Sequence, residues 1–509
     1  MFHFLTRGLS ASALVVLSVQ AAQADLTAQD VWSDWRAYLA GTGYTVTGTE
    51  AMAGNTLTVS DVVLSIDLPE EDGAMTLTMG ALSFTENGDG TVSVDMPTQM
   101  PLRVTGTDGI DGVPFEVLVN YRQSAPTMTV SGDPADMTYT YTAASVGLTL
   151  DSLSSDGVAV SSDDVRATFM LGNVMGTTRM QAGDLRRYVQ TFQTGGLTYD
   201  VFFRDPEGSG SFTMAGAADG LEIDGVSDIP GEMDTENMSN MIKAGFGGTG
   251  TLTFGPGSSR VNFADGGETF AYESESQGGS LGVGLTRDGL SYDLTQRGVA
   301  MNMMGSQIPL PIALTAAEMG FRLAFPTLAS DEPQDFRLAL KLADFTMSDM
   351  IWSIFDPAAQ LPRDAATLDI DLSGKAKLLA DIFDPAVAAQ MEAADAPPAE
   401  LDALSVNALT LRAVGAELTG NGAFTFDNTD LVSFDGMPRP EGVLNLRLVG
   451  GNGLLDKLVA MGLLPEGEAM GARMMMGLFA VPGSEPDTLN SKIEINDQGH
   501  ILANGQRIQ

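Results

Sequence analysis

The segment from Asn55 to Met96 alternates apolar and more polar residues with a period of two, and the polar turns PEEDG and ENGDG interrupt it. The alternating apolar positions are Val62, Leu64, Ile66, Leu68, Met75, Leu77, Met79, Val92, Val94 and Met96. Successive side chains of a strand point to opposite faces of its sheet, and Gly, Asp and Asn favour the turns between strands. The segment therefore predicts antiparallel strands with one buried face and one solvated face.

Similar alternating runs fill much of the remaining chain, so we expect a mainly β (α+β) protein with roughly 20 to 25 strands and a few amphipathic helices. An open flat sheet rarely holds so many strands. We therefore expect a long antiparallel sheet that is strongly coiled or split into two layers.

Helical spacing replaces the alternation in a few places. Between Asp25 and Tyr44, the apolar residues share one face of a predicted helix that is expected to dock on the sheet, with surface recognition by Trp32 as the alternative. The spacing of Leu185, Tyr188, Val189 and Phe192 also predicts a helix, which is expected to stop at Gly195. Further helical segments are expected at 234–248 and 452–464.

The N-terminus has the features of a secretory signal peptide. Arg7 precedes a short apolar run, and Ala22-Gln23-Ala24 forms a small-x-small cleavage site, so we expect cleavage after Ala24 and a periplasmic protein. No later stretch reaches the ~18 apolar residues that a membrane helix needs. The expected organisation is a signal peptide at 1–24, a β-rich half at 25–245, and a β-rich half with helices at 246–509, with one continuous domain as the alternative.

The formal net charge of −40 disfavours binding to nucleic acid and to anionic membrane surfaces, because both are negatively charged. The chain has no cysteine, which excludes disulfides, thiolate nucleophiles and Cys-ligated metals. A chain of this length can bury a large core without covalent cross-links.

The sequence contains only weak matches to catalytic and cofactor-binding motifs. Gly278–Gly282 fits G-x-S-x-G, and 245–250 fits G-x-G-x-x-G, but neither has the strand-to-helix context that its chemistry requires. Beyond the signal peptide, His500 is the single histidine, and we expect it to lie in an exposed turn. We therefore predict a non-enzymatic protein with no catalytic residue and no cofactor, although the many carboxylates leave a two-carboxylate hydrolase as a further hypothesis.

Metal binding is also not predicted. Six aspartates in Gly/Asn/Ser turns could attract calcium, but none belongs to a D-x-[DN]-x-[DN]-G loop: Asp151, Asp156, Asp219, Asp224, Asp427 and Asp430. Methionines cluster at 301–304 and 474–476, where thioethers could bind Cu(I) or supply an adaptable apolar surface. We favour the apolar surface, which could be a core or the lining of a ligand groove. The candidate lining residues are Leu64, Ile66, Leu77 and Met79.

Three segments, VWSDWRAYLAGTGY (31–44), MGSQIPLPIALTAAEMGFRLAFP (304–326) and LPRDAATLDIDLSGKAKLLADIFD (361–384), resemble an exported family of Gram-negative bacteria, domain of unknown function 2125. The ending GHILANGQRI is more loosely similar to exported β-rich families of AsmA-like or lipid-groove architecture. Neither resemblance implies an activity or site residues.

Two functional hypotheses are favoured. The first is a non-enzymatic periplasmic protein that holds a lipid or another apolar molecule in a groove of its sheet. The second is an envelope structural or assembly protein that binds protein partners through sheet edges or through the helix that carries Trp32 and Trp35.

Overall fold

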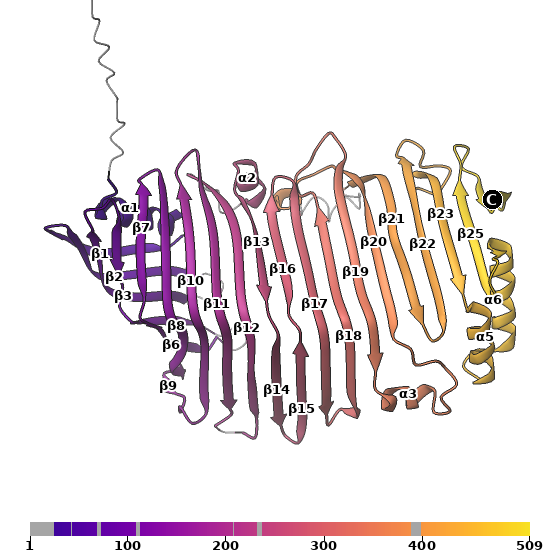
Figure 1. Ribbon diagram of the computed structural model, residues 1–509, viewed down its shortest axis with the longest axis horizontal. Coiled ribbons are helices and arrows are strands. Elements are labelled where there is room, and N and C mark those ends of the chain that lie inside the picture. The colour runs from indigo at the N-terminus through magenta and orange to yellow at the C-terminus, as the bar shows by residue number, and fades with distance from the viewer. Residues whose placement is uncertain are drawn as a thin grey trace, which may run out of the picture.

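The computed structural model describes residues 25–41, 43–68, 73–107, 112–206, 208–231, 237–387 and 399–509. These residues form one large antiparallel sheet, which confirms the mainly β class (Figure 1). Strands that are neighbours in the sequence are mostly neighbours in the sheet, so the chain runs from one end of a long molecule to the other. The predicted signal peptide lies outside the described residues.

The helix α1 (Ala28–Gly41) precedes the first strands of the sheet and confirms the predicted N-terminal helix. The strands of the first part of the sheet are β1 (Thr45–Ala53), β2 (Thr56–Leu68), β3 (Gly73–Glu86), β4 (Val92–Asp95), β5 (Gln99–Thr107), β6 (Pro114–Ser124), β7 (Thr127–Asp133), β8 (Asp136–Ser155), β9 (Val158–Ala159), β10 (Val165–Gln181), β11 (Leu185–Arg204) and β12 (Ser211–Pro230). In Figure 1, β1 to β3 run across the direction of the later strands, because the sheet curls at this end.

The second part continues the same sheet. Its helices are α2 (Met238–Lys243), α3 (Asp349–Phe355), α5 (Gly451–Ala460) and α6 (Glu466–Phe479). Its strands are β13 (Gly247–Phe254), β14 (Gly257–Asp265), β15 (Glu268–Ser276), β16 (Gly279–Thr286), β17 (Gly289–Gly305), β18 (Ile308–Phe325), β19 (Gln334–Met347), β20 (Ala366–Leu378), β21 (Ala399–Ala413), β22 (Ala416–Asp427), β23 (Arg439–Val449), β24 (Val481–Pro482), β25 (Thr488–Ile495), β26 (Ile501–Ala503) and β27 (Gln506–Arg507).

The hydrophobic core is concentrated at the N-terminal end, between α1 and the curled strands. Trp32, on α1, is 2% exposed, and its ring centroid lies 5.8 Å from that of Phe84 on β3. Leu57 and Val59 of β2 are equally buried in this cluster. The alternative of surface recognition by Trp32 is therefore wrong, because the indole fills the core and its Nε1–H donates to Glu50 over 2.7 Å.

The helix predicted around Leu185 and Phe192 is also wrong, because these residues lie on β11. This strand is hydrogen-bonded along its length to β10 on one side and to β12 on the other. Tyr188 is buried and its neighbour Val189 is exposed, as strand geometry requires. Pairing on both edges outweighs the local helical spacing of the apolar residues.

The hydrogen-bonded sheet crosses the predicted boundary between 245 and 246, which falls between α2 and β13. The C-terminal part of β12 pairs with β13, where Ile223 faces Leu252, and the N-terminal part of β12 pairs with β14. The division into two halves stays a prediction. The helix predicted at 452–464 is confirmed as α5. Of the helix predicted at 234–248, Met238–Lys243 are helical as α2, 247–248 begin β13 instead, and 234–236 lie outside the described residues.

Candidate apolar binding site

One face of the sheet carries continuous rows of apolar side chains. Residues that face each other on neighbouring antiparallel strands lie on the same side of a sheet. The pairing from β13 to β23 defines one such row, and its members are Leu252, Leu281, Leu294, Phe321, Leu340, Ile370, Leu409, Gly420 and Leu446. Apart from the glycine, every member is apolar and bulky.

Two further rows flank it on the same face, two residues away along each strand except at Val406 of β21, which is three residues from Leu409 because the pairing shifts there. One row runs from β16 to β25 through Val283, Tyr292, Leu323, Leu338, Leu372, Val406, Gly422, Leu444 and Ile493. The other runs from β18 to β25 through Met319, Leu342, Leu368, Leu411, Leu418, Leu448 and Leu489. We call the three rows together the apolar face.

The apolar face is accessible to solvent. Val283 is 46%, Leu340 42% and Leu411 49% exposed, although each is a large aliphatic side chain. In Figure 1, α2 and α3 lie at the ends of the strands, and α5 and α6 lie beside the last strands, so these helices do not form a layer over the sheet. Exposed apolar surface that continues over many strands is typical of a binding surface.

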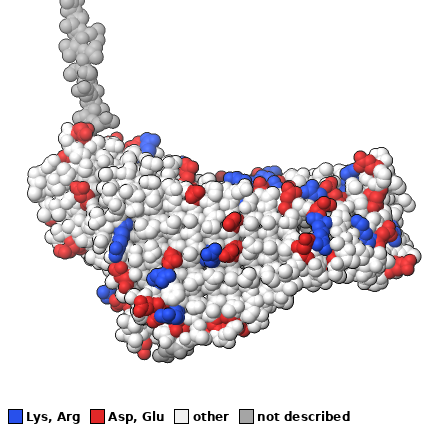
Figure 2. Space-filling view, turned by 60° about the horizontal axis from the view of Figure 1, so that its bottom comes forward, with Lys and Arg blue, Asp and Glu red and all other residues white. Residues whose placement is uncertain are grey.

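The opposite face is polar and its charges are paired across strands. Asp293 lies 2.6 Å from Arg322, Arg337 lies 2.6 Å from Asp371, and Lys341 lies 2.9 Å from Glu318. On the surface shown in Figure 2, acidic and basic side chains are likewise interspersed. The two faces of the same strands therefore differ in chemistry, as the period-two pattern predicts.

This polar face bears on the hydrolase hypothesis, since a cavity of about 240 Å³ there is lined by several of these carboxylates. Hydrogen bonding from Arg337 lowers the pKa of Asp371, and a bond from Asn407 adds to the effect. A general acid of a glycosidase needs a raised pKa instead. The arrangement is that of structural ion pairs, while the absence of enzymatic activity stays a prediction.

At the N-terminal end the apolar rows lead to a cavity under α1. The row that contains Leu252 continues through β12, β11, β10 and β8 to β7, and its members there are Ile223, Phe192, Gly176, Tyr141 and Met128. Met128 lines a cavity of about 330 Å³ between α1 and the curled sheet. We call it the α1 cavity.

Three of the four predicted lining residues lie at this cavity. Leu64, on β2, is 7% exposed, and Leu77 and Met79, on β3, pack against the same core. Ile66 is half-buried and pairs with Met75, outside the cavity lining. The structure thus places Leu64, Leu77 and Met79 together, and their contact with a ligand stays a prediction.

Other lining residues were not anticipated, since they come from distant strands: Tyr139, Thr178, Tyr188 and Gln190. The hydroxyl of Tyr139 donates to Oδ2 of Asp34 over 2.6 Å, and Nη1 of Arg186 lies 2.9 Å from Oδ1. Burial raises the pKa of Tyr139, and the nearby Asp34 charge raises it further. Burial likewise raises the pKa of Tyr188 to about 12. The pairing register of strands that are far apart in the sequence brings these groups together. No local sequence pattern predicts that register.

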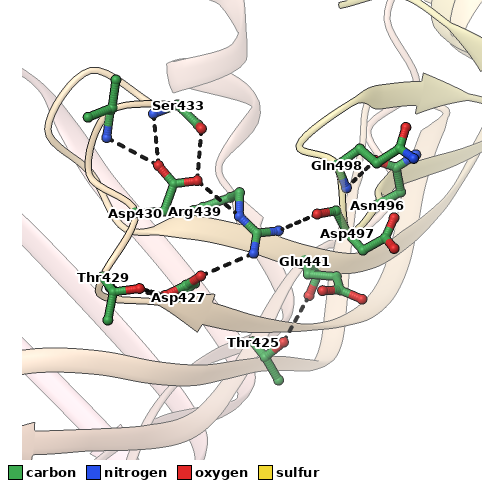
Figure 3. Close-up of polar contacts among 11 residues, drawn as sticks. Thr425, Asp427, Thr429, Asp430, Ser433, Arg439, Glu441, Asn496, Asp497 and Gln498 are labelled. Carbon is green, nitrogen blue, oxygen red and sulfur yellow. Dashed lines mark hydrogen bonds and ion pairs between the residues drawn. The ribbon is translucent and has the colours of Figure 1, made fainter.

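The turn aspartates Asp427 and Asp430 serve a structural role. Arg439 lies 3.1 Å from a carboxylate oxygen of each, and its Nη1 donates to the carbonyl of Asp497 over 2.9 Å (Figure 3). Bonds from Thr429 lower the pKa of Asp427, and bonds from Ser433 lower that of Asp430. The guanidinium thus ties the β22–β23 loop to the β25–β26 turn. In the described parts of the chain, no group of three or more His, Asp or Glu residues could hold a metal ion.

Ser280, His500 and the clustered methionines lie outside the apolar rows. Ser280 is within β16 between two paired strands, which confirms that the G-x-S-x-G match lacks a nucleophile elbow. His500 lies at the predicted turn, and its backbone N–H donates to Oδ1 of Asn496 over 3.0 Å. The residue is half-buried, so the expectation that it is exposed is wrong. Met474 and Met475 are exposed on α6, and Met304 is exposed on β17.

The family model described as an uncharacterized protein conserved in bacteria (DUF2125) matches residues 251–502. The match includes two of the three segments on which the resemblance rests and confirms it over those residues. The comparison with curated proteins found no match, and neither did the comparison with solved structures. Among the described residues, no helix combines the length and the apolar character that a membrane span requires.

Proposed function

We propose that this chain, which belongs to the DUF2125 family through residues 251–502, is an exported carrier that binds lipid-like molecules through their hydrocarbon chains on the apolar face. The observation that carries the proposal is the run of three adjacent apolar rows on consecutive strands, with Val283, Leu340 and Leu411 exposed. At about 4.8 Å per strand, the row from β13 to β23 extends over roughly 40 Å, which exceeds the length of an extended acyl chain.

The energetics favour long hydrocarbon chains as the ligand. Each buried methylene contributes about 0.8 kcal/mol, so ten of them contribute roughly 8 kcal/mol before the entropic cost of association. A short chain does not offset that cost, whereas a chain that lies along the rows does. The paired charges of the opposite face take no part in this binding.

A matched pair of substitutions on β19 tests the proposal. Leu340 points to the apolar face and is 42% exposed, whereas Ala339 points to the opposite face, near Arg322 and Asp371. We expect Leu340→Lys to weaken the binding of N-phenyl-1-naphthylamine, a fluorophore that brightens in apolar sites, and Ala339→Lys to leave it unchanged. Mass spectrometry of gently purified protein should also detect co-purified lipid. A wild-type protein that neither brightens the dye nor carries lipid would contradict the proposal.

A periplasmic location forms part of the proposal, supported by the Arg7 and Ala22-Gln23-Ala24 pattern of the N-terminus. Fractionation of cells that express the full chain, together with N-terminal sequencing of the mature protein, tests it. We expect a periplasmic protein that begins at Asp25. A protein retained in the cytoplasm with its first residues intact would overturn this part.

A second candidate function, partner binding through a sheet edge, is favoured by one observation. Within the described residues β1 pairs with β2 alone, and its side chains are almost all exposed, including Met52 at 57%. Such an edge can accept a strand from another protein. In-cell crosslinking from Met52 replaced by a photoreactive residue tests this function, and a reproducible lack of crosslinked partners would exclude it at this edge.

A further inference from the structure

The α1 cavity has the size and the chemistry of a hydrocarbon pocket. Its volume of about 330 Å³ lies at the lower end of the range for small-molecule sites and is about twice that of an engineered cavity that binds benzene. Leu64, Leu77, Met79 and Met128 all line the cavity. Apolar walls of this kind favour a flexible aliphatic chain.

The charge in the cavity is already neutralised by the protein. Asp34 is the one charged residue among those that line it, and its carboxylate is held by the hydroxyl of Tyr139 and by Arg186. A charged headgroup placed there would lose its hydration without gaining a partner of opposite charge. The cavity therefore suits the uncharged end of a ligand.

The helix α1 closes this end of the molecule. Trp32 is buried against Phe84, the backbone N–H of Ala28 donates to Glu86 over 3.0 Å, and Glu50 accepts from Trp32. These bonds join α1 to β1 and to β3. A chain that lies along the row from Leu252 to Met128 thus meets a fixed wall at the cavity, whereas the opposite end of the row reaches the last strands of the sheet.

We propose that the α1 cavity buries the methyl-terminal part of an aliphatic chain, so that a bound lipid lies on the apolar face with its tail toward α1 and its polar end away from it. This inference rests on the proposed function, and it adds the ligand's orientation and the residues that receive its tail. Leu64, Leu77 and Met79 contact the tail, and Gln190, exposed at the edge of the cavity beside β12, borders the entrance.

The tryptophans provide a direct test. Trp35 lines the cavity and Trp32 lies beside it, while the third tryptophan, Trp352, is on α3 and can be removed by Trp352→Phe. We expect stearate with a nitroxide near its methyl end to quench the remaining fluorescence several-fold more strongly than stearate with a nitroxide near its carboxyl end. Nitroxide quenching acts over short distances, so the difference reports which end enters the cavity.

A second pair of matched substitutions tests whether the tail enters the α1 cavity or binds elsewhere on the apolar face. Gln190→Phe narrows the entrance at an exposed position, and Thr191→Phe places the same side chain on the opposite face of β11. We expect Gln190→Phe to abolish most of the quenching by the methyl-end label, and Thr191→Phe to retain it. Thermal melts of both variants establish that each is folded.

The outcomes distinguish this inference from the proposed function. Equal quenching by the two labels, stronger quenching by the carboxyl-end label, or quenching that Gln190→Phe leaves unchanged would overturn the orientation, even if N-phenyl-1-naphthylamine still binds and Leu340→Lys still weakens it. A wild-type protein that binds neither the dye nor the stearates would overturn both proposals.

Discussion

Tyr139 of β8 donates a hydrogen bond of 2.6 Å to the buried carboxylate of Asp34 on α1, and this bond joins two elements 105 residues apart in the sequence. Asp34 is 4% exposed, so its charge depends on Tyr139 and on Arg186 for compensation. The contact holds α1 over the cavity that the apolar rows approach. Fold stability and the geometry of the candidate site therefore depend on the same bond.

We expect Tyr139→Phe to lower the free energy of unfolding by about 1–3 kcal/mol, because it leaves a buried carboxylate oxygen without its donor. Urea unfolding monitored by tryptophan fluorescence measures the change. Tyr199→Phe is the control, since its hydroxyl bonds the side chain of Ser259, which is neutral, and we expect about 0.5–1.5 kcal/mol there. Equal losses in the two variants would contradict the role assigned to Asp34.

The raised pKa of Tyr188 predicts a loss of stability at high pH. In the unfolded chain the phenol ionises near its ordinary pKa of 10.0, and in the folded protein it ionises at about 12. Between these values the unfolded state binds fewer protons, so the stability present below pH 10 is lost as the pH rises toward 12. The expected slope from this group is at most about 1.4 kcal/mol per pH unit.

Stability curves for wild type and Tyr188→Phe over this interval check the prediction. The stability of the variant should fall less steeply with pH over this interval, and its absorbance titration should contain one fewer late-ionising tyrosine than that of the wild type. A wild-type protein whose slope matches that of the variant would show that Tyr188 ionises normally.

Arg439 predicts an acid-sensitive connection at the C-terminal end. The pKa values of Asp427 and Asp430 are lowered in the folded protein. The contribution of these two carboxylates to folding stability is therefore fully present above the ordinary carboxyl pKa, and it is lost as the pH falls through their pKa values in the folded protein. At neutral pH, Arg439→Met should increase amide hydrogen exchange in the β22–β23 loop and in the β25–β26 turn. Arg260→Met breaks an exposed pair with Glu273, and it should leave exchange nearly unchanged. Equal exchange in the two variants would show that Arg439 does not hold the loop.

The sequence predicts the strands well, because each pattern is local and has a period of two. It does not predict which strands become neighbours across the sheet, and that register brings Met128, Tyr139 and Gln190 to the α1 cavity. Leu64, Leu77 and Met79 could be found because they share the most regular alternating segment. The residues on β11 were missed since their helical spacing suggested a helix, and only pairing with β10 and β12 makes them a strand.

The alternation also changes phase inside strands, at residues that the pattern does not mark. In β2, the buried residues before Asp61 are Leu57 and Val59, and those after it are Val62 and Leu64. The buried positions thus change from odd-numbered to even-numbered residues at Asp61. Asp61 has a φ of 54°, and the pairing with β3 shifts there. A residue with positive φ thus keeps the apolar side chains on one side of the strand where strict alternation would move them to the other.

Gly80 occupies the corresponding place in β3, where φ is 70°. A Cβ added at Gly80 would meet its nearest heavy atom, Cγ of Pro97, at 3.7 Å, so there is room for a methyl group. The cost of Gly80→Ala is therefore conformational, and we expect about 1–2 kcal/mol of destabilisation because an L-residue is strained in the left-handed region.

Gly172→Ala provides the contrast, because Gly172 lies within β10 without a positive φ and its added Cβ would have no atom within 4 Å. We expect this substitution to be neutral or to stabilise by up to about 1 kcal/mol, since alanine restricts the unfolded chain. Urea unfolding of the two variants compares them directly. If Gly80→Ala were as stable as Gly172→Ala, the positive φ at Gly80 would not be needed to keep Leu77 and Leu82 on the buried side of β3.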